Sequence, residues 1–137
     1  MQRDEHPGVR VMNIRKYVGC KYDPHGRDPK TGLDCYGLAI CIYRDMGITL
    51  PDPLYADTET ETNKRILESL EATIRNEKLE DPEPGCIIEL NVLGEPSHIG
   101  IYIGNGDFIH ASRKTGVVVD KLFRWGKRVK GFYRVLQ

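Results

Sequence analysis

The segment that most restricts the fold of this chain is a short amphipathic helix predicted to begin at Cys35. Asp34 precedes it as a favoured N-cap residue, because its carboxylate can accept the free backbone N–H groups of the first turn. Gly47 ends the pattern ahead of a proline turn. Apolar residues recur at steps of three and four along one face, at Leu38, Ala39, Ile42 and Met46. Such a stripe faces a core, so the helix has to pack against other apolar elements.

The C-terminal half of the chain predicts those elements as β-strands. Short β-branched or aromatic runs, separated by glycine turns, occupy residues 86–90, 99–103, 107–111, 117–120 and 131–136. Further helices are predicted over Val9–Val18 and Thr60–Glu77, and a proline-containing loop over residues 21–31 leads into the Cys35 helix. We therefore expect an α+β fold in which N-terminal helices pack on an antiparallel β-sheet.

Length and charge limit the partners that this chain can have. At 137 residues it is expected to form one domain, residues 1–137. Lys plus Arg and Asp plus Glu each total 20, so no net charge attracts nucleic acid or a membrane. From Arg113 onward there are eight basic residues and one acidic residue, Asp120. A polyanion-binding patch would explain this excess, and so would basic side chains on the solvent-facing side of strands. We expect neither nucleic acid nor a membrane as a partner.

The N-terminus and the cysteines indicate the compartment. The charged start of the chain lacks the apolar run of a signal peptide, and no stretch approaches the roughly 20 apolar residues of a membrane span. The protein is expected to be made and left in the cytosol. The four cysteines form no Cys-x-x-Cys pair and no regular framework, which favours reduced thiols over disulfides or a zinc site. No metal and no cofactor is expected.

Cys35 is the candidate nucleophile, because a thiol reacts as its thiolate and the N-terminus of a helix favours negative charge. An imidazolium nearby would lower the pKa of the thiol further. Two histidines that could act with it, His98 and His110, lie on a predicted β-hairpin. The sequence therefore predicts a cysteine–histidine site for nucleophilic catalysis.

The register of this hairpin decides whether the histidines can cooperate, because side chains alternate between the faces of a strand. If residues 105–106 form a two-residue turn, Gly104 pairs with Asp107 and the histidines point to opposite faces. If Gly104, Asn105 and Gly106 form a three-residue loop, Ile103 pairs with Asp107 and both histidines share one face. The catalytic hypothesis requires the shared face.

Three ordered motifs resemble the NlpC-type cell-wall endopeptidases, which are small papain-like cysteine peptidases. The motifs are Asp34-Cys35-Tyr36-Gly37-Leu38, His98-Ile99-Gly100-Ile101-Tyr102-Ile103-Gly104 and Phe108-Ile109-His110-Ala111-Ser112. The resemblance extends from about Tyr17 to Tyr133. It implies a papain-like α+β fold and hydrolysis of a stem-peptide amide of peptidoglycan, typically the bond between D-glutamate and a diamino acid.

The resemblance also implies a role for each site residue. Cys35 is expected to be the nucleophile, His98 the proton-transferring base and acid, and His110 the residue that orients His98. Asp34 is expected to hold the free amine of the peptide substrate. Tyr22 is expected to line the oxyanion side of the site, and Tyr36 is expected to contribute to substrate binding.

Two departures from the family pattern bear on the setting of the protein. Many members have serine after the cysteine, whereas tail-associated members from bacteriophages often have an aromatic residue, as this chain has Tyr36. Gly85-Cys86 stands where a glycine–aspartate pair often opens the strand before the histidine. We expect a phage tail protein that reaches the cell wall as part of a virion. The alternatives are a structural tail-assembly component, or a peptidase or acyltransferase that acts on a protein such as another tail protein.

Overall fold

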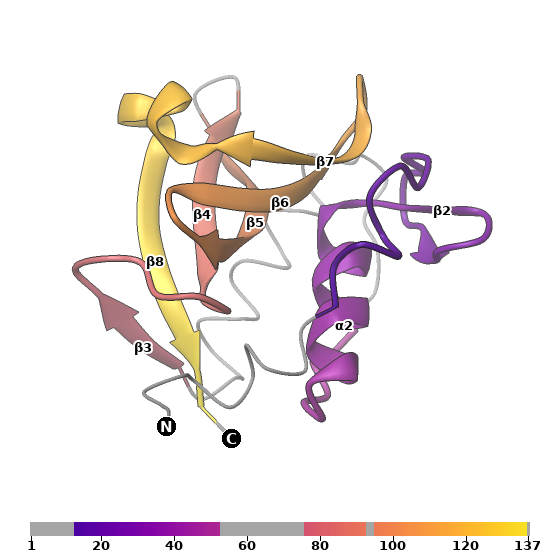
Figure 1. The fold of residues 1–137 in the computed structure, drawn as a ribbon, viewed down its shortest axis with the longest axis horizontal. Helices are drawn as coiled ribbons and strands as arrows, with labels where there is room; N and C mark the ends of the chain where they lie inside the picture. Colours follow the sequence, from indigo (N-terminus) through magenta and orange to yellow (C-terminus); the bar gives the residue numbers. More distant parts are fainter. Residues whose placement is uncertain (1–12, 53–75, 93–94, 137) are drawn as a thin grey trace.

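The computed structural model describes residues 13–52, 76–92 and 95–136, which form one helix beside antiparallel β-structure (Figure 1). The six-stranded sheet has the strand order β3-β8-β4-β5-β6-β7, and a small sheet pairs β1 with β2. The elements are β1 (Arg27–Asp28), β2 (Gly32–Leu33), α2 (Cys35–Asp45), β3 (Asn76–Leu79), β4 (Ile87–Val92), β5 (Glu95–Gly104), β6 (Asp107–Ser112), β7 (Gly116–Lys121), the 3-10 turns η1 (Leu122–Arg124) and η2 (Gly126–Arg128), and β8 (Val129–Val135).

The capped helix predicted from the sequence is confirmed as α2. The Asp34 side chain accepts the backbone N–H of Gly37 at 2.7 Å, so the predicted N-cap is formed. The helix ends at Asp45, and Gly47 follows with a φ of 84°, a left-handed conformation that glycine adopts at little cost. Leu38, Ala39 and Ile42 are buried, as their spacing predicts.

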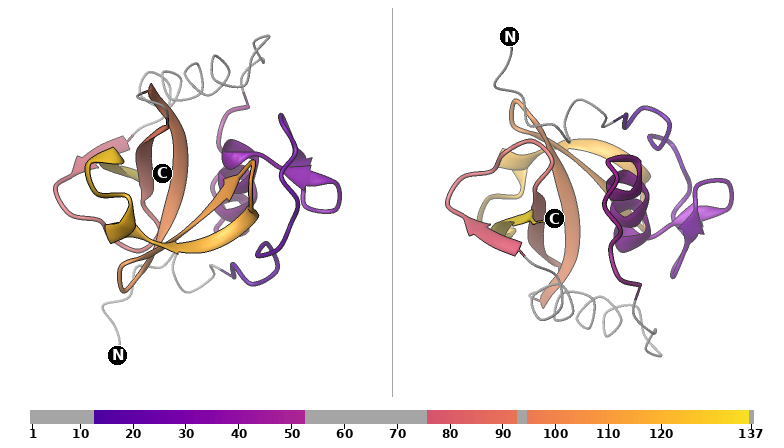
Figure 2. Two further views of the ribbon diagram at one scale, coloured as in Figure 1. Left: turned by 90° about the horizontal axis from the view of Figure 1, so that it is seen from above. Right: turned by 90° about the horizontal axis from the view of Figure 1, so that it is seen from below.

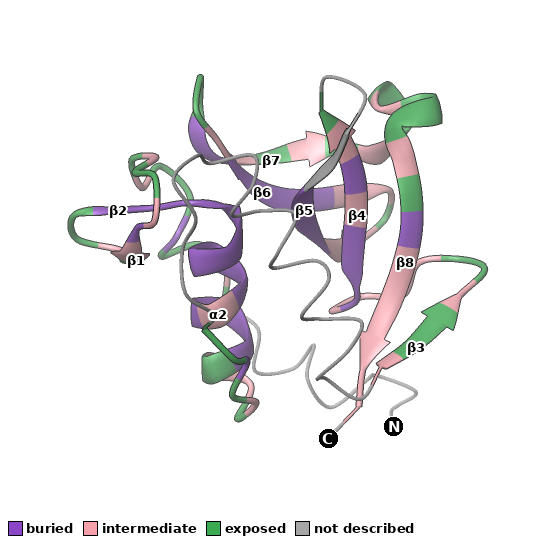
Figure 3. Ribbon diagram, turned by 180° about the vertical axis from the view of Figure 1, so that it is seen from behind, coloured by how far each residue is buried: buried purple, intermediate pink, exposed green. Residues whose placement is uncertain are grey.

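The helix lies between the large sheet and the small β1–β2 sheet (Figure 2). Its buried face packs on residues from β4 to β7 in one apolar cluster, to which the sheet contributes Ile87, Ile99, Ile101, Ile109, Ala111 and Val117. A second cluster contains Cys86, Ile88, Leu90 and Phe108. Because side chains alternate along a strand, the two clusters cover opposite faces of the sheet. Figure 3 shows the buried residues concentrated along α2 and the central strands.

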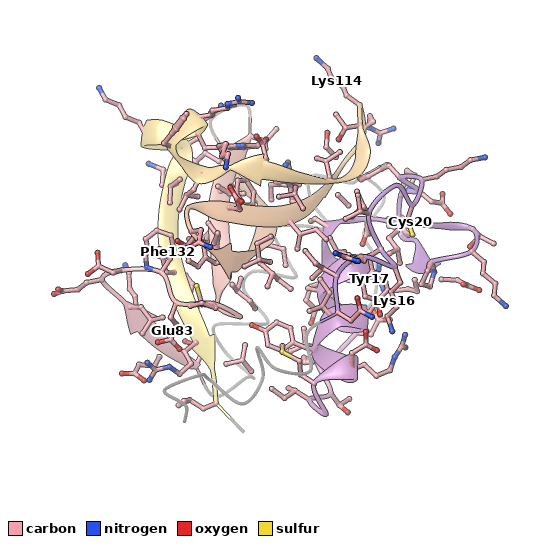
Figure 4. All side chains as sticks on the ribbon, in the orientation of Figure 1. Lys16, Tyr17, Cys20, Glu83, Lys114 and Phe132 are labelled. Atoms are coloured by element: carbon pink, nitrogen blue, oxygen red, sulfur yellow. The ribbon has the colours of Figure 1, made fainter. Side chains whose placement is uncertain are left out.

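The expected strands are all present, whereas the described ends of the two other predicted helices are not helical. Residues 13–19, the described part of the predicted Val9–Val18 helix, form a turn in which Tyr17 is buried against α2 (Figure 4). The hydroxyl of Tyr17 donates to Asp45 at 2.6 Å, and the backbone N–H of Gly19 donates to the carbonyl of Val117 at 2.9 Å. These contacts fasten the turn to α2 and to the sheet.

The predicted Thr60–Glu77 helix falls mainly on residues 53–75, outside the described residues. Its last two predicted residues, Asn76 and Glu77, belong instead to β3, where they pair with Val135 and Arg134 of β8. Cross-strand pairing therefore overrides the helical pattern at this end of the segment. Within the described ranges, no helix is both long and apolar enough to cross a membrane.

The β5–β6 hairpin combines features of both registers considered from the sequence. Asn105 and Gly106 form a two-residue turn with φ angles of 55° and 80°, and Gly104 pairs with Asp107. The next pair is Tyr102 with Phe108, so Ile103 is an extra residue in a β-bulge. The bulge restores the pairing of Ile101 with Ile109. The expected consequence of the two-residue turn, histidines on opposite faces, is therefore wrong, because the bulge shifts the register back.

The space that Gly100 leaves on this hairpin generates the first prediction. A Cβ at Gly100 would lie 2.6 Å from Cδ2 of Phe108 and 3.1 Å from the carbonyl oxygen of Ile109. We expect Gly100→Ala to lower the free energy of unfolding by about 1–3 kcal/mol, because overpacking must displace the Phe108 ring. Urea denaturation measures this. In the double variant with Phe108→Leu, the loss should be smaller than the sum of the single losses, and strict additivity would contradict the steric explanation.

Candidate active site

The two predicted histidines meet in a direct hydrogen bond. Nε2 of His98 on β5 lies 2.8 Å from Nδ1 of His110 on β6, and the rings stand edge to face with centroids 5.0 Å apart. Their side chains are buried, with 9% of His98 and 3% of His110 exposed. The structure thus brings together the histidines that the sequence separates by twelve positions.

Aromatic rings enclose this pair on the face of the sheet opposite α2. Trp125, between η1 and η2, stacks on His98 at 5.8 Å, and Phe108 stacks on His110 at 4.7 Å. Burial, followed by the influence of His110, lowers the pKa of His98 to about 3. Burial also lowers the pKa of His110, although Asp120 works against that effect. The apolar enclosure therefore favours neutral imidazoles in the resting structure.

Cys35 is the first residue of α2, and its thiol lies against β5. The side chain is 5% exposed, and the backbone N–H groups of Ile99 and Tyr36 are hydrogen-bond donors to the sulfur. Ile99 directly follows His98 in the chain, so the sulfur reaches β5 next to that histidine. The thiol thus lies at the backbone of the residue that follows the candidate base, on the side of the sheet where α2 packs.

The expected lowering of the pKa of Cys35 is wrong for the resting structure. Burial, reinforced by the negative charge of Asp34, raises the pKa of the Cys35 thiol to about 12. The backbone N–H groups and Arg27 oppose this shift but are weaker than the loss of hydration. These surroundings therefore favour the neutral thiol over the thiolate.

Asp34 is held inside the protein by three donors. Besides the Gly37 backbone N–H, Arg27 donates to its Oδ1 at 2.8 Å and the backbone N–H of His25 donates to its Oδ2 at 3.0 Å. The side chain is 2% exposed. Asp34 therefore caps α2 and fastens the preceding loop to it. Contact of Asp34 with a substrate amine stays a prediction. Such an amine would have to share carboxylate oxygens that already accept these hydrogen bonds.

Tyr36 and Tyr22, both expected to contact the substrate or the oxyanion, lie in different environments. The Tyr36 side chain is completely buried, and its hydroxyl donates to the carbonyl oxygen of Pro51. A role for Tyr36 in substrate binding stays a prediction. Tyr22 forms a parallel bridge with Leu33, and Arg113 lies 5.4 Å from its ring centre. A role for Tyr22 on the oxyanion side stays a prediction.

Asp120 is a site residue that the sequence analysis missed. On β7, its Oδ2 lies 3.4 Å from Nε2 of His110 and accepts the indole N–H of Trp125 at 3.2 Å. Two features of the sequence could have identified it: it is the sole acidic residue after Arg113, and its strand follows the His110 strand directly. The overall charge of the segment concealed it. Among the described residues, no group of three or more His, Cys, Asp or Glu side chains could hold a metal ion.

The buried His98 predicts a loss of stability in acid. Its pKa falls from 6.5 to about 3 on folding, so the unfolded chain binds a proton in that window whereas the folded chain does not. Above pH 6.5 the neutral His98 costs the folded protein nothing. As the pH falls from 6.5 towards 3, proton binding by the unfolded chain lowers the free energy of unfolding progressively. Between pH 7 and 5 the wild type should lose about 2 kcal/mol more than His98→Gln in urea denaturation. Parallel pH profiles of the two proteins would contradict the neutral assignment of His98.

The bonding of Asp34 predicts that its main contribution is structural. Asp34→Ala removes a cap and leaves Arg27 without this buried partner, so the free energy of unfolding should fall by about 3 kcal/mol. Asp28 is the matched control, because it is exposed and accepts the single backbone N–H of Lys30 at 2.9 Å. Asp28→Ala should cost about 1 kcal/mol or less in the same denaturation assay. Equal losses in the two variants would refute the structural role.

Comparison with known proteins finds relatives that are named endopeptidases. Over 127 residues the chain is 32% identical to the probable endopeptidase p60 of Listeria innocua, covering 91% of the chain and 24% of that protein. Over 131 residues it is 31% identical to the murein DD-endopeptidase MepS/murein LD-carboxypeptidase of Escherichia coli K12, covering 93% of the chain and 62% of that protein. The chain thus spans about a quarter of p60 and under two thirds of MepS.

Solved structures show the same fold. NlpC2 of Trichomonas vaginalis superposes with a TM-score of 0.68 at 24% identity, covering the whole chain and 49% of that structure. The NlpC/p60 domain of the peptidoglycan hydrolase SagA superposes with a TM-score of 0.65 at 20% identity, covering 97% of the chain and 100% of that domain. These likenesses confirm the expected papain-like α+β fold. Since the model of the NlpC/P60 family matches residues 19–134, this chain belongs to the NlpC/P60 family.

Proposed function

We propose that this domain is a cysteine endopeptidase that hydrolyses peptide bonds in the stem peptides of peptidoglycan. The proposal is supported by a buried thiol at the tip of a capped helix and by a hydrogen-bonded histidine pair. Cys35 lies at the tip of a capped helix with its sulfur at the N–H of Ile99, and the preceding residue, His98, is hydrogen-bonded to His110. A nucleophile, a base and an orienting group are the parts that acyl transfer requires.

The pKa shifts indicate how the nucleophile forms. Because burial keeps the Cys35 thiol and the His98 imidazole neutral, a standing thiolate–imidazolium pair is disfavoured at rest. In the proposed first step the thiol proton moves to Nδ1 of His98 while the sulfur bonds to the carbonyl carbon of the substrate. Nε2 of His98 stays engaged with His110, which holds the ring in place during the transfer.

The proton that His98 takes from the Cys35 thiol is used when the amide bond breaks, and hydrolysis of the thioester follows. His98 delivers it to the nitrogen of the scissile amide, the carbon–nitrogen bond breaks, and the amine product leaves a thioester on Cys35. Water then attacks the thioester carbonyl while His98 accepts one of its protons. Collapse of that intermediate releases the carboxylic acid product, and the proton returns to the sulfur.

The first turn of α2 offers donors for the oxyanion of each tetrahedral intermediate. The N–H of Gly37 is already bonded to the Asp34 side chain, and the N–H of Leu38 is bonded to the Asp34 carbonyl at 3.0 Å. We therefore assign the stabilising donor to the backbone N–H of Cys35 at the start of the helix. A single donor of this kind contributes roughly 10²–10³-fold to the rate in serine proteases.

The proposed substrate class follows from the relatives and the motifs. The p60 proteins are named endopeptidases, and MepS is named a murein endopeptidase. We propose the bond between D-glutamate and the diamino acid as the scissile bond, as the resemblance of the motifs implies. The bond that a murein DD-endopeptidase cleaves, the activity named for MepS, is the competing bond.

We also propose that the protein acts in a phage tail. The support is the aromatic residue that follows Cys35, since the tail-associated members that the sequence resembles often have one there. Detection of this chain in purified virions by mass spectrometry would test the setting separately from the chemistry.

A digest of defined muropeptides tests the reaction and the bond together. Wild-type protein should create new amine ends, and the product masses should correspond to cleavage after D-glutamate. Cys35→Ala should lower kcat/KM by about 10⁴-fold or more, because removing a nucleophile leaves only binding and oxyanion stabilisation.

Cys20→Ser is the matched control for that digest, because Cys20 is a second, partly exposed thiol that is hydrogen-bonded to the backbone carbonyl of Lys16. It should retain wild-type activity. Hydrolysis that persists in Cys35→Ala would refute the nucleophile. A wild-type protein that yields no new amine ends would refute the peptidase and favour a structural role.

A further inference from the structure

We propose that Asp120 is a positioning residue that fixes the proton positions on both histidines and thereby leaves Nδ1 of His98 free of a proton, ready to act as the base. This inference rests on the proposed peptidase function for its consequence in the reaction. Its structural part, the assignment of a tautomer to each buried histidine, can be tested without any substrate.

The first argument is the surroundings of Nε2 of His110. This nitrogen is buried, and within the described ranges it has no hydrogen-bond partner of good geometry, but Oδ2 of Asp120 lies 3.4 Å away. A buried nitrogen without a partner is costly, and a carboxylate can only accept. The neighbouring carboxylate therefore favours a proton on Nε2 of His110.

The tautomer of His110 dictates that of His98. With its proton on Nε2, a neutral His110 has a bare Nδ1, which must accept in the 2.8 Å hydrogen bond to Nε2 of His98. His98 then donates from Nε2 and keeps Nδ1 bare. This is the form that can accept the thiol proton. The reversed arrangement would put the His98 proton on Nδ1, where it blocks that step.

Asp120 is itself held by two donors. The backbone N–H of Lys121 donates to its Oδ1 at 2.8 Å, and the indole N–H of Trp125 donates to its Oδ2 at 3.2 Å. Although partial burial works in the opposite direction, these hydrogen bonds keep the pKa of Asp120 below its usual value. The side chain is therefore a fixed anion at neutral pH, even though 28% of it is exposed.

Trp125 links the carboxylate to the far histidine. Its ring stacks on His98 at an interplanar angle of 13°, and its indole nitrogen is bonded to Asp120. The guanidinium carbon of Arg128 lies 4.2 Å from the centre of the Trp125 ring. One side chain thus couples the position of Asp120 to the position of the proposed base.

The charged groups around the pair are consistent with a specific role for Asp120. From β7, the ammonium group of Lys121 is paired with Asp107 of β6 at 2.7 Å. Arg128 faces Trp125, and the neutral thiol of Cys35 lies at the neighbouring Ile99. Asp120 is the anion that both approaches His110 and raises its pKa against the effect of burial. Its charge favours the imidazolium that forms when His98 takes the thiol proton.

Asp120→Asn is the most direct variant. The carboxylate serves three donors with two acceptor oxygens, namely His110, Lys121 and Trp125, whereas an amide offers one acceptor and brings two N–H donors of its own. We expect kcat to fall on the order of 10- to 100-fold while KM changes little, by analogy with the aspartate of a serine-protease triad. The acidic limb of the pH profile of kcat should move to lower pH, because the histidine pair loses the anion that raises the pKa of His110.

Asp107→Asn is the matched control, since Asp107 lies on the adjacent strand with similar side-chain exposure, 26%, and pairs with a lysine instead of a histidine. It should keep the wild-type kcat and pH profile. A purely structural role for Asp120 would lower stability and leave the pH profile of the remaining activity unchanged, which would overturn the proposal.

Nitrogen-15 NMR of the imidazoles decides the tautomers independently of activity. In the wild type at neutral pH, both His98 and His110 should carry their proton on Nε2, and Asp120→Asn should populate the Nδ1-protonated form of His110. If Asp120→Asn leaves both histidine spectra unchanged, the proposal is wrong. If the wild type cleaves no muropeptide but shows these tautomers, the proposed function fails while the assignment to Asp120 stands.

Discussion

The hydrogen bond between His98 and His110 depends on the register of β5 against β6, and the chemistry proposed for this site depends on that hydrogen bond. A one-residue slip of a strand would carry one imidazole to the other face of the sheet. The β-bulge at Ile103 prevents this by absorbing the residue that a two-residue turn leaves over. Gly100 leaves room beside the pair for the Phe108 ring that covers His110. The backbone of one hairpin therefore determines whether the histidines can act together.

Burial gives the site its second property, which is electrical neutrality at rest. The helix that carries Cys35 has to pack its apolar face on the sheet, and that packing removes the thiol from water. Trp125 and Phe108 remove the histidines from water on the other face. In such surroundings an ion pair is costly until substrate and fixed dipoles compensate it. Cys35 and His98 are therefore expected to become charged only while bonds are changing. Two anions are already present, Asp34 next to Cys35 and Asp120 at His110.

Local patterns in the sequence predicted the parts of the fold that depend on local physics. The N-cap at Asp34, the apolar face of α2 and the strands of the C-terminal half follow from capping chemistry and residue spacing, and the structure confirms them. The prediction of a helix ending at Glu77 was wrong for its last two residues, because they pair with β8, a tertiary contact that the local pattern does not contain. The bulge at Ile103 and the raised pKa of Cys35 could not be predicted from local patterns either. The register of two strands and the depth at which a side chain is buried both depend on tertiary packing. Asp120 was concealed for the same reason, because its partner lies on another strand.

The most direct test of the account is intact-protein mass spectrometry of enzyme quenched with acid during turnover of a defined muropeptide. We expect a mass increase equal to the acyl half of the stem peptide, and fragmentation that places the adduct on Cys35 as a thioester. His98→Gln should abolish the adduct while the protein stays folded. An acyl fragment attached to another residue, or full turnover by protein whose Cys35 thiol has been blocked, would contradict the proposal that this helix tip and the histidine pair form one catalytic unit.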